Sequence, residues 1–532
     1  MVTLVATEWI AIAVFLVGVL GFGFHLRDRS HNADDFFLAG RSLPPWLQAF
    51  STVATNLNAN DFLGLAAFAY TYGVIVIGVP IGNMLAIVLA TLVVIPFIRR
   101  LRVFSLGEWL NDRFDRPVGD AYDVIWTFVW MFVNMGLYIY AGALVLNTLL
   151  GWSLWVSIAL VVIVGTTYTL LGGFGAVAGS DGLQFILMFV PLVLLVPISL
   201  SMVGGFSELM AGLRDYQNTM LPADNPLGAQ FPLSGSTMNA ALLYLGLVAQ
   251  AMAYWSSESQ ILQRPLAARD ERGAQLGYLY TAVWYALIVP AVILIPGLVA
   301  AVLFPGLDNP DEAMPRLLSE ALPPGLLGAA IVGLLAAVLS SIDSQLNNFQ
   351  TFFTQRIYRR FVRTDEAERH YVRVGRIVGV IFMVLTVGMA YVFSLQPLMF
   401  LFAQSILATI MPTFATLALV GGLWDRMTTK AALTGGVFGL VFSVVLAFVL
   451  GQEAVYPRAL YTMVATTLVI VVTSLVTTPG AGEVPTGFLP TARENLDEAV
   501  APVVRRVALL VLAIGVVMFI GFVLVFDVFG SA

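Results

Sequence analysis

The sequence predicts an all-α polytopic membrane protein with about 14 transmembrane helices. Apolar residues make up 59% of the 532 positions and charged residues only 11%, and the mean hydropathy is +0.89. A soluble domain typically carries about 25% charged residues, because water must solvate its surface. Apolar runs of the roughly 20 residues that cross a bilayer also recur along the whole chain.

We therefore expect a single transmembrane domain over residues 1–532, in which a helix at 8–26 comes first. The run at 8–26 follows no basic cluster and lacks a small-residue cleavage site, so it is interpreted as a membrane helix. The expected spans are 8–26, 46–71, 74–97, 121–150, 153–171, 175–203, 239–260, 275–304, 324–354, 373–395, 397–424, 430–451, 457–478 and 503–527.

The basic residues support this segmentation. With the N-terminus outside, 23 of the 26 Lys and Arg residues fall in inner loops, and only Arg214, Arg316 and Arg458 fall outside. An even number of spans places both termini outside, and we expect a multi-pass protein of the cell (inner) membrane. Orientation and lipid headgroup contact explain the dense basic run at 356–376, so we expect no nucleic-acid partner.

Composition and motifs exclude several kinds of catalytic site. The chain has no cysteine, and His25, His31 and His370 lie in short polar loops outside the apolar runs. No Ser/His/Asp constellation, metal cluster or phosphate-binding glycine loop lies among the spans. We therefore expect a protein that is not an enzyme and that needs no cofactor.

Polar residues interrupt the second expected span. The segment NLNAND at 56–61 places Asn56, Asn58, Asn60 and Asp61 where lipid cannot satisfy them. Asn and Asp compete for backbone hydrogen bonds, so an unwound segment is expected here. Unwinding frees carbonyls that coordinate a cation in discontinuous transporter helices. The alternative is a buried polar contact between helices.

The seventh expected span has the same character. Gln250, Tyr254, Trp255 and Glu258 lie close together in it, five spans after the first interruption. This spacing fits inverted repeats that meet at a central site near the bilayer midplane.

The ninth expected span contains LSSIDSQLNN at 339–348. Ser340, Asp343 and Ser344 share one helix face through their i, i+3 and i+4 spacing. Hydroxyls beside a carboxylate supply hard oxygen ligands for an alkali cation. The alternative is that the serines hydrogen-bond to their own helix. Asp181, in the sixth span, is a further membrane carboxylate.

Together these segments resemble the sodium/solute symporter family, which includes the bacterial sodium/galactose symporter and the animal sodium/glucose cotransporters. The resemblance runs from about residue 35 to residue 440. The motifs that carry it are FFLAGRSLPPW at 36–46, FSLGEWLNDRFDR at 104–116, FVNMGLYIYAGAL at 132–144, GGFGAVAGSDGLQ at 172–184, QRPLAA at 263–268, and LSSIDSQLNN followed by RIY at 356–358.

The resemblance implies the LeuT fold, which consists of two inverted five-helix repeats and flanking helices. The first repeat would span 46–203, the second 239–424, and the C-terminal helices 430–527. It also implies symport of a small solute with Na⁺ by alternating access, with Na⁺ as coupling ion.

The resemblance also implies ligands for sodium. The shared sodium site of the family falls on the carbonyls of Ala54, Leu57 and Ala337 and on the hydroxyls of Ser340 and Ser341. A further cation site of some members falls on Asp181, Asp343 and Ser344, together with Ser340. At Asp343 this chain has a carboxylate where the family usually has a hydroxyl. Three interpretations therefore stay open: a stronger sodium site, a proton site or a structural network.

The substrate positions depart from the sugar pattern of the family. Asp61 stands where the galactose symporter has a glutamine, and Pro80 and Asn83 replace a glutamate and a serine. Tyr254 and Gln404 match the family. The expected substrate residues are Asp61, Asn83, Tyr254, Trp255 and Gln404. Three roles stay open for Asp61. Beside aromatic rings it suits the binding of a cationic group, it equally suits hydrogen bonds from a polyol, and it could instead cap the unwound segment.

The leading hypothesis is therefore a sodium-coupled symporter of a small polar organic solute, with the lipid bilayer as its surroundings. One alternative is proton coupling through Asp61, Asp181 or Asp343. A second, from another class, is a membrane solute sensor, which the short inner loops disfavour. The sequence does not choose among sugars, polyols, amino acids and carboxylates as substrate.

Overall fold

The structure is a computed structural model. It describes residues 43–57, 59–101, 106–114, 116–220, 236–364, 366–451, 454–478 and 502–525, and helical residues scattered between 6 and 18. The part of the chain that it describes is helical, as predicted, and an isolated bridge between Leu43 and Ala268 is the one β-type pairing recorded there.

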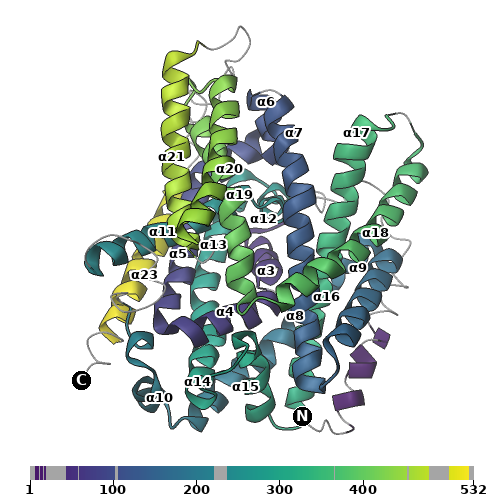
Figure 1. The fold of residues 1–532 in the computed structure, drawn as a ribbon, viewed down its shortest axis with the longest axis vertical. Coiled ribbons are helices and arrows are strands. Elements are labelled where there is room, and N and C mark those ends of the chain that lie inside the picture. The colour runs from purple at the N-terminus through teal and green to yellow at the C-terminus, as the bar shows by residue number, and fades with distance from the viewer. Residues whose placement is uncertain are drawn as a thin grey trace.

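The described helices follow one another along the chain, most of them with short connections (Figure 1). The first half contains α3 (Pro45–Asn56), α4 (Ala59–Tyr72), η2 (Gly73–Ile77), α5 (Gly78–Leu101), α6 (Leu106–Phe114), α7 (Arg116–Ile125), η3 (Trp126–Trp130), α8 (Met131–Leu150), α9 (Leu154–Met202), α10 (Phe206–Gly212) and η4 (Asp215–Gln217). The second half contains α11 (Ser236–Ser257), α12 (Ser259–Leu266), α13 (Glu271–Val289), η6 (Pro290–Leu294), α14 (Ile295–Leu303), η7 (Pro310–Glu312), α15 (Ala313–Ala321), α16 (Leu326–Phe352), η8 (Phe353–Tyr358), α17 (Arg359–Phe361), α18 (Glu368–Ser394) and α19 (Met399–Leu423). The last helices are α20 (Thr429–Leu450), α21 (Val455–Val476) and α23 (Pro502–Val523).

Local signals set several helix ends. Ser153, Asp270 and Thr428 accept hydrogen bonds from backbone N–H groups in the first turns of α9, α13 and α20. At the corner between α4 and α5, Gly73 has a φ of 80°, and a Cβ there would lie 2.1 Å from the carbonyl oxygen of Gln217. Both the backbone conformation and the close approach therefore require glycine at this position.

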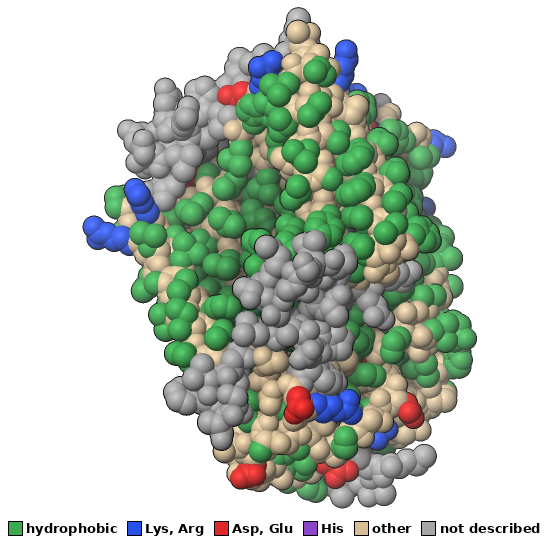
Figure 2. Space-filling model, turned by 60° about the vertical axis from the view of Figure 1, so that its left-hand side comes forward, with side chains coloured by type: hydrophobic (Ala, Val, Ile, Leu, Met, Phe, Trp, Pro, Cys, Tyr) green, Lys and Arg blue, Asp and Glu red, His purple; other side chains and the backbone are tan. Residues whose placement is uncertain are grey.

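Nine helical segments among the described residues are long and apolar enough to cross a membrane. Figure 2 shows hydrophobic side chains over the middle of one face and most of the visible charged side chains toward its two ends. This distribution is typical of a protein whose middle is surrounded by hydrocarbon.

One region differs from the expected division into spans. Helix α9 runs without a break from Leu154 to Met202, where the sequence predicts separate spans at 153–171 and 175–203. Glycine lowers helix propensity without forbidding the helix, so the glycines at 172, 173 and 175 do not interrupt it. Its 49 residues correspond to roughly 74 Å of straight helix, more than two hydrocarbon thicknesses. The number of crossings in this segment stays a prediction.

The long helices form two packed groups. Helix α5 packs against α11 and α13, and α13 also packs against α3, while α8, α9, α16 and α18 all contact one another in a second group. Helix α4 contacts α8 and α16 of the second group and also α19. Helices α20 and α21 pack beside α19, while α23 packs on α5 and α13.

The two ends of the molecule carry different loops. Helices α6, α7 and α17 lie at the upper end of Figure 1, and α10, α14 and α15 at the lower end. At the upper end, Arg113 donates to the carbonyls of Gly421, Trp424 and Met427 and thereby caps the C-terminus of α19. Ion pairs from Arg356 to Glu108 and from Arg360 to Asp120 join α6 and α7 to η8 and α17, which follow α16.

At the lower end, the segment between α14 and α16 is tied to α4 and α19. Asp311 is fully buried and accepts a hydrogen bond from the N–H of Met399, the first residue of α19, at 2.9 Å. The hydroxyl of Tyr70 in α4 donates to the carbonyl of Phe304 and accepts from the N–H of Leu307. Burial raises the pKa of Asp311 to about 8, although the Met399 N–H acts to lower it.

Substituting Asp311→Asn should remove a pH-dependent loss of stability. The folded protein retains the Asp311 proton up to about pH 8, whereas an unfolded chain releases it near pH 4. The native state therefore binds more protons in this window, and its stability falls as the pH rises. The decrease in the thermal unfolding temperature in detergent, from about pH 5 to about pH 8.5, should be smaller in the variant. Equal decreases in both proteins would show that Asp311 does not hold this proton.

Candidate functional site

The first feature of the candidate site is the break between α3 and α4. Helix α3 ends at Asn56, Leu57 has φ −84° and ψ 83°, and α4 begins at Ala59. Residue 58 lies outside the described residues. The interruption thus falls within the segment 56–61 that the sequence singles out. Asp61 lies in the first turn of α4, where the helix dipole stabilises a negative charge.

The break leaves backbone oxygens at the end of α3. The last carbonyls of a helix have no partner within it, and the C-terminal end carries a partial negative charge. The N–H of Leu57 bonds back to the carbonyl of Val53 at 2.7 Å. The carbonyl of Ala54 belongs to this last turn, although the side chain of Ala54 is outside the described residues.

A second break separates α11 from α12. Helix α11 ends at Ser257 and α12 begins at Ser259, and Glu258 lies between them; its N–H still donates to the carbonyl of Tyr254 and its carbonyl still accepts from Leu262. Its side chain is 3% exposed and accepts a hydrogen bond from the indole Nε1 of Trp130 at 2.8 Å. Trp130 is the last residue of the π-helical segment η3, and such segments often occur at functional sites.

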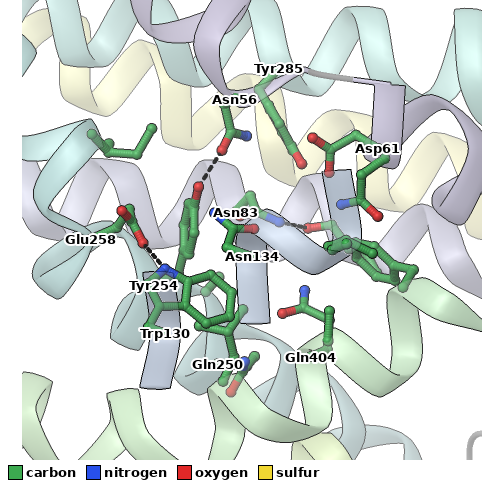
Figure 3. A pocket seen from close by; sticks show the side chains of 18 of the residues that line it. Asn56, Asp61, Asn83, Trp130, Asn134, Gln250, Tyr254, Glu258, Tyr285 and Gln404 are labelled. Carbon is green, nitrogen blue, oxygen red and sulfur yellow. Dashed lines mark hydrogen bonds between the residues drawn. The ribbon is translucent and has the colours of Figure 1, made fainter. Parts of the chain in front are cut away.

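A cavity lies beside both breaks, and side chains from α3, α4, α5, α8, α11, α13, α19 and α21 line it (Figure 3). Its polar lining consists of amides, phenols and two carboxylates. These residues are Asn56, Asn60, Asp61, Asn83, Trp130, Asn134, Tyr138, Gln250, Tyr254, Glu258, Tyr285, Gln404 and Tyr456.

Hydrogen bonds join several of the lining side chains, both between helices and within one helix. The hydroxyl of Tyr254 in α11 donates to the side-chain oxygen of Asn56 in α3 at 2.7 Å. The amide of Asn134 donates to the hydroxyl of Tyr138 at 2.9 Å within α8. Figure 3 shows Tyr285 and Asp61 on one side of the group and Glu258 on the other.

Four of the five predicted substrate residues line this cavity: Asp61, Asn83, Tyr254 and Gln404. Trp255 is placed differently. It is fully buried, is not among the lining residues, and its Nε1 donates to the Oδ1 of Asn83 at 2.6 Å. Because successive helical residues point about 100° apart, Tyr254 reaches the cavity while Trp255 supports Asn83 from behind.

The sequence-based assignment omits several lining residues. Gln250 and Glu258 stand out as polar residues within an apolar span, a signal that was available without the structure. Tyr285 and Tyr456 lie in ordinary apolar helices, so no sequence pattern marks them. Their role in the lining depends on how α13 and α21 pack against the broken helices.

The predicted sodium ligands of α16 lie at the middle of that helix. Ser340, Ser341 and Ser344 are partly exposed there, whereas Ala337 and Asp343 are buried. The hydroxyl of Ser341 donates to the carbonyl of Ala337 at 2.9 Å, which is the hydrogen bond to its own helix considered as the alternative. A hydroxyl that donates its proton retains lone pairs for a cation, so this bond and a cation site are compatible.

The possible second cation site is described only in part. Asp181 lies in α9, and its side chain is outside the described residues. Asp343 is 1% exposed, and its Oδ1 accepts a hydrogen bond from the amide of Asn347 at 3.2 Å. The same carboxylate can therefore serve a structural network within α16.

A protein-family comparison now identifies the framework that carries this site. The model of the sodium:solute symporter family matches residues 36–439. The chain belongs to this family. The match confirms the resemblance of the sequence motifs and identifies a transporter framework, and the multiple apolar helices make the symporter a multi-pass membrane protein.

Curated relatives in the family share about a quarter of their residues with this symporter. A sodium/glucose cotransporter of Vibrio parahaemolyticus is 27% identical over 493 residues, which cover 87% of this chain and 89% of the relative. A sodium/myo-inositol cotransporter 2 of Mus musculus is 27% identical over 474 residues, which cover 82% of this chain and 69% of the relative.

Solved structures agree with the LeuT-like fold. A Na⁺-coupled sialic acid symporter in a substrate-bound outward-open state superposes with a TM-score of 0.73 at 22% identity, over 89% of this chain and 98% of that one. Mhp1, a nucleobase-cation-symport-1 family transporter, superposes with a TM-score of 0.55 at 15% identity, over 88% and 99%. At these identities the similarity shows the fold alone.

Helix α21 also contributes to the site of the symporter, although it follows the ten helices of the expected repeats. Tyr456 lines the cavity, and Arg458, two residues later, is fully buried. The guanidinium of Arg458 donates to the Oγ and the carbonyl of Ser405 and to the Oγ1 of Thr409, all in α19. Ser405 follows Gln404, so Arg458 holds α19 directly behind a lining residue. Charge counting places Arg458 on the outer side, at the start of the expected span 457–478, and the structure places it in the first turn of α21.

Substituting Arg458→Met should lower the stability of the symporter by about 2–3 kcal/mol, because bonds from a charged donor are lost and buried oxygens of α19 lose a partner. Thermal unfolding in detergent measures the change. The matched substitution Arg316→Met removes a half-exposed ion pair with Glu312 and should have little effect. Equal shifts for the two variants would show that Arg458 does not stabilise α19.

Proposed function

We propose that this protein is a sodium-coupled symporter that moves a small polar organic solute across the cell (inner) membrane by alternating access. One observation carries the proposal: two helices break inside the protein, and both breaks border one polar cavity. Backbone that is not helical is tolerated at membrane depth only where protein or a water-filled cavity surrounds it. In secondary transporters such breaks supply substrate and ion ligands.

The proposed sodium ligands are the carbonyls of Ala54, Leu57 and Ala337 and the hydroxyls of Ser340 and Ser341. Carbonyl and hydroxyl oxygens are hard ligands that suit an alkali cation. The carbonyl of Ala54 lies at the negative end of α3, and the oxygens of Ala337 and Ser341 already lie 2.9 Å apart. We also propose Asp181, Asp343 and Ser344 as a second cation site.

Alternating access is supported by the way the cavity is enclosed. It lies between helices of the two packed groups, and the contacts of Asp311 and Tyr70 close the segment between α14 and α16 onto α19 and α4. A movement of this segment relative to α4 and α19 that breaks these contacts would open the structure at that end.

We further propose that the end with α6, α7 and α17 faces the cytoplasm and that both termini lie outside. Arg113, Arg356 and Arg360 gather at that end, as the positive-inside rule requires of cytoplasmic loops. The boundaries 46–203 and 239–424 of the two repeats are proposed on the same framework, since the breaks lie at corresponding positions in them.

Proteoliposomes that contain the full chain test the proposed coupling. An inward Na⁺ gradient should drive accumulation of solutes from a panel of polyols, amines, amino acids and carboxylates, because the coupling ion must enter with the solute. Replacing Na⁺ by K⁺ should abolish accumulation. Accumulation that follows a pH gradient and ignores Na⁺ would replace sodium coupling by proton coupling.

The substitution Ser341→Ala should raise the Na⁺ concentration for half-maximal transport about tenfold, because one oxygen ligand is lost. Transport titrated with Na⁺ at saturating solute measures this effect. Ser394→Ala, which removes an exposed serine that also bonds within its own helix, is the matched control and should leave the titration unchanged. Identical titrations for both variants would exclude Ser341 as a ligand.

A further inference from the structure

Three polar atoms on one wall of the cavity have no hydrogen-bond partner among the described residues. They are the Oε1 and Nε2 of Gln250 in α11 and the hydroxyl oxygen of Tyr456 in α21. The two residues line the cavity and are 4% and 2% exposed, so solvent does not replace the missing partners. Native proteins pair nearly all of their buried polar atoms, because a buried donor or acceptor without a partner is costly. The unpaired atoms therefore favour a ligand that binds here during transport.

Close packing of α11 against α21 brings the two side chains to the same wall. A Cβ at Gly246 in α11 would lie 2.8 Å from the carbonyl oxygen of Tyr456 and 2.9 Å from its Cβ, so a side chain there would push the two helices apart. Gln250 lies four residues after Gly246, and residues at this spacing share one helix face. Gln250 therefore lies on the face of α11 that meets α21.

Bonds that leave these three atoms unused hold the wall in position. Arg458 donates to Ser405 and Thr409 and so ties the first turn of α21 to α19. A phenol that its surroundings already fix loses little conformational freedom when it binds a ligand, so Tyr456 is preorganised for such a contact. The amide of Gln250 can align with the ligand by rotation about its terminal side-chain torsion, which has a broad energy profile.

The donors and acceptors of this wall select the kind of group that can satisfy it. The amide of Gln250 offers both a donor and an acceptor, and the phenol of Tyr456 can act as either. A carboxylate only accepts, so it would leave the Oε1 of Gln250 unpaired. An ammonium group only donates, so it would leave the Nε2 unpaired. A hydroxyl group both donates and accepts, and it therefore fits this wall.

We propose, on the basis of the symport function above, that Gln250 and Tyr456 form a subsite for a hydroxyl group of the solute. The solute hydroxyl donates to the Oε1 of Gln250 and accepts from the hydroxyl of Tyr456, while the Nε2 donates to a neighbouring oxygen of the solute. Tyr456 thereby makes α21, which follows the helices of the expected repeats, a determinant of specificity. A solute with hydrogen in place of this hydroxyl leaves the buried atoms unpaired, so the cavity discriminates against it.

A cycle that combines solute changes with one protein change tests this inference. The solutes are glucose, myo-inositol and glycerol, each with the analogues that lack a single hydroxyl group. Each solute is added to the full chain in proteoliposomes under a Na⁺ gradient, and the initial rate of uptake gives its half-saturating concentration. Tyr456→Phe removes the phenolic hydroxyl alone. Tyr391→Phe, at a side chain that is 43% exposed on α18, is the matched control.

In the unsubstituted protein, removal of one particular hydroxyl group should raise the half-saturating concentration about tenfold, because buried atoms of Gln250 and Tyr456 lose their partner. Tyr456→Phe should weaken binding of the parent solute and reduce the ratio between that analogue and its parent by about threefold or more. The ratios for the other hydroxyl groups should stay the same, and Tyr391→Phe should change none of them.

The stability of the empty protein provides a second readout. Because the Tyr456 hydroxyl has no partner among the described residues, Tyr456→Phe should not lower the thermal unfolding temperature in detergent without solute. A decrease as large as that of Arg458→Met would assign the hydroxyl to the protein framework and overturn the inference.

A panel in which no analogue binds more weakly than its parent also overturns the inference. The same holds if Tyr456→Phe leaves every ratio unchanged, as it would if a water molecule rather than the solute paired with the hydroxyl. Failure of the proposed function is a separate outcome, in which uptake is independent of Na⁺ while the ratios between parent and analogue can still be measured.

Discussion

The constraint on which this structure depends is the need to satisfy every backbone N–H and C=O group inside lipid. Helices meet that need within themselves, and the described chain is accordingly helical almost throughout. Where the helix stops at membrane depth, backbone groups that lose their helical partners require protein or a bound ligand, although at Glu258 both backbone groups keep theirs in Tyr254 and Leu262. The two interruptions, at Leu57 and at Glu258, occur beside the same polar cavity. The candidate site therefore exists because the chain departs from helix in two places and packs the departures together.

The surrounding helices hold these interruptions in position. Asn56 and Tyr254 join the end of α3 to α11, and Trp130 of η3 fixes the carboxylate of Glu258. Behind them, Arg458 of α21 fastens α19 through neutral oxygens next to Gln404. A flanking helix thus shapes the cavity as directly as the helices of the repeats do.

The sequence predicted the membrane class, the helical fold and the first interruption, because each depends on local composition. Asn56, Asn60 and Asp61 are conspicuous in an apolar run, and their position beside a cavity follows from the high cost of polar groups in lipid. Family motifs added the LeuT-like framework and the sodium:solute symporter family. The undivided helix α9 was not predicted, since glycine content is a weak guide to where a helix stops.

Contacts between distant segments were beyond the sequence. Trp255 and Tyr254 are adjacent and both aromatic, and only the packing of α5 shows that Trp255 bonds to Asn83 rather than facing the cavity. Tyr456 and Arg458 lie at the start of the expected span 457–478, on the outer side. Their contacts with α19 depend on a tertiary arrangement that no periodicity in α21 reveals.

Backbone hydrogen exchange with and without sodium tests the central claim most directly. If Na⁺ binds at the break of α3, amides in peptides that cover residues 54–61 and 337–344 should exchange more slowly in Na⁺ than in K⁺ at equal ionic strength. Peptides of α20, and of the part of α18 that lies away from the candidate site, should exchange equally in both salts. Exchange at 54–61 and 337–344 that is the same in Na⁺ and K⁺ would contradict the sodium site and, with it, the assignment of the break as the coupling element.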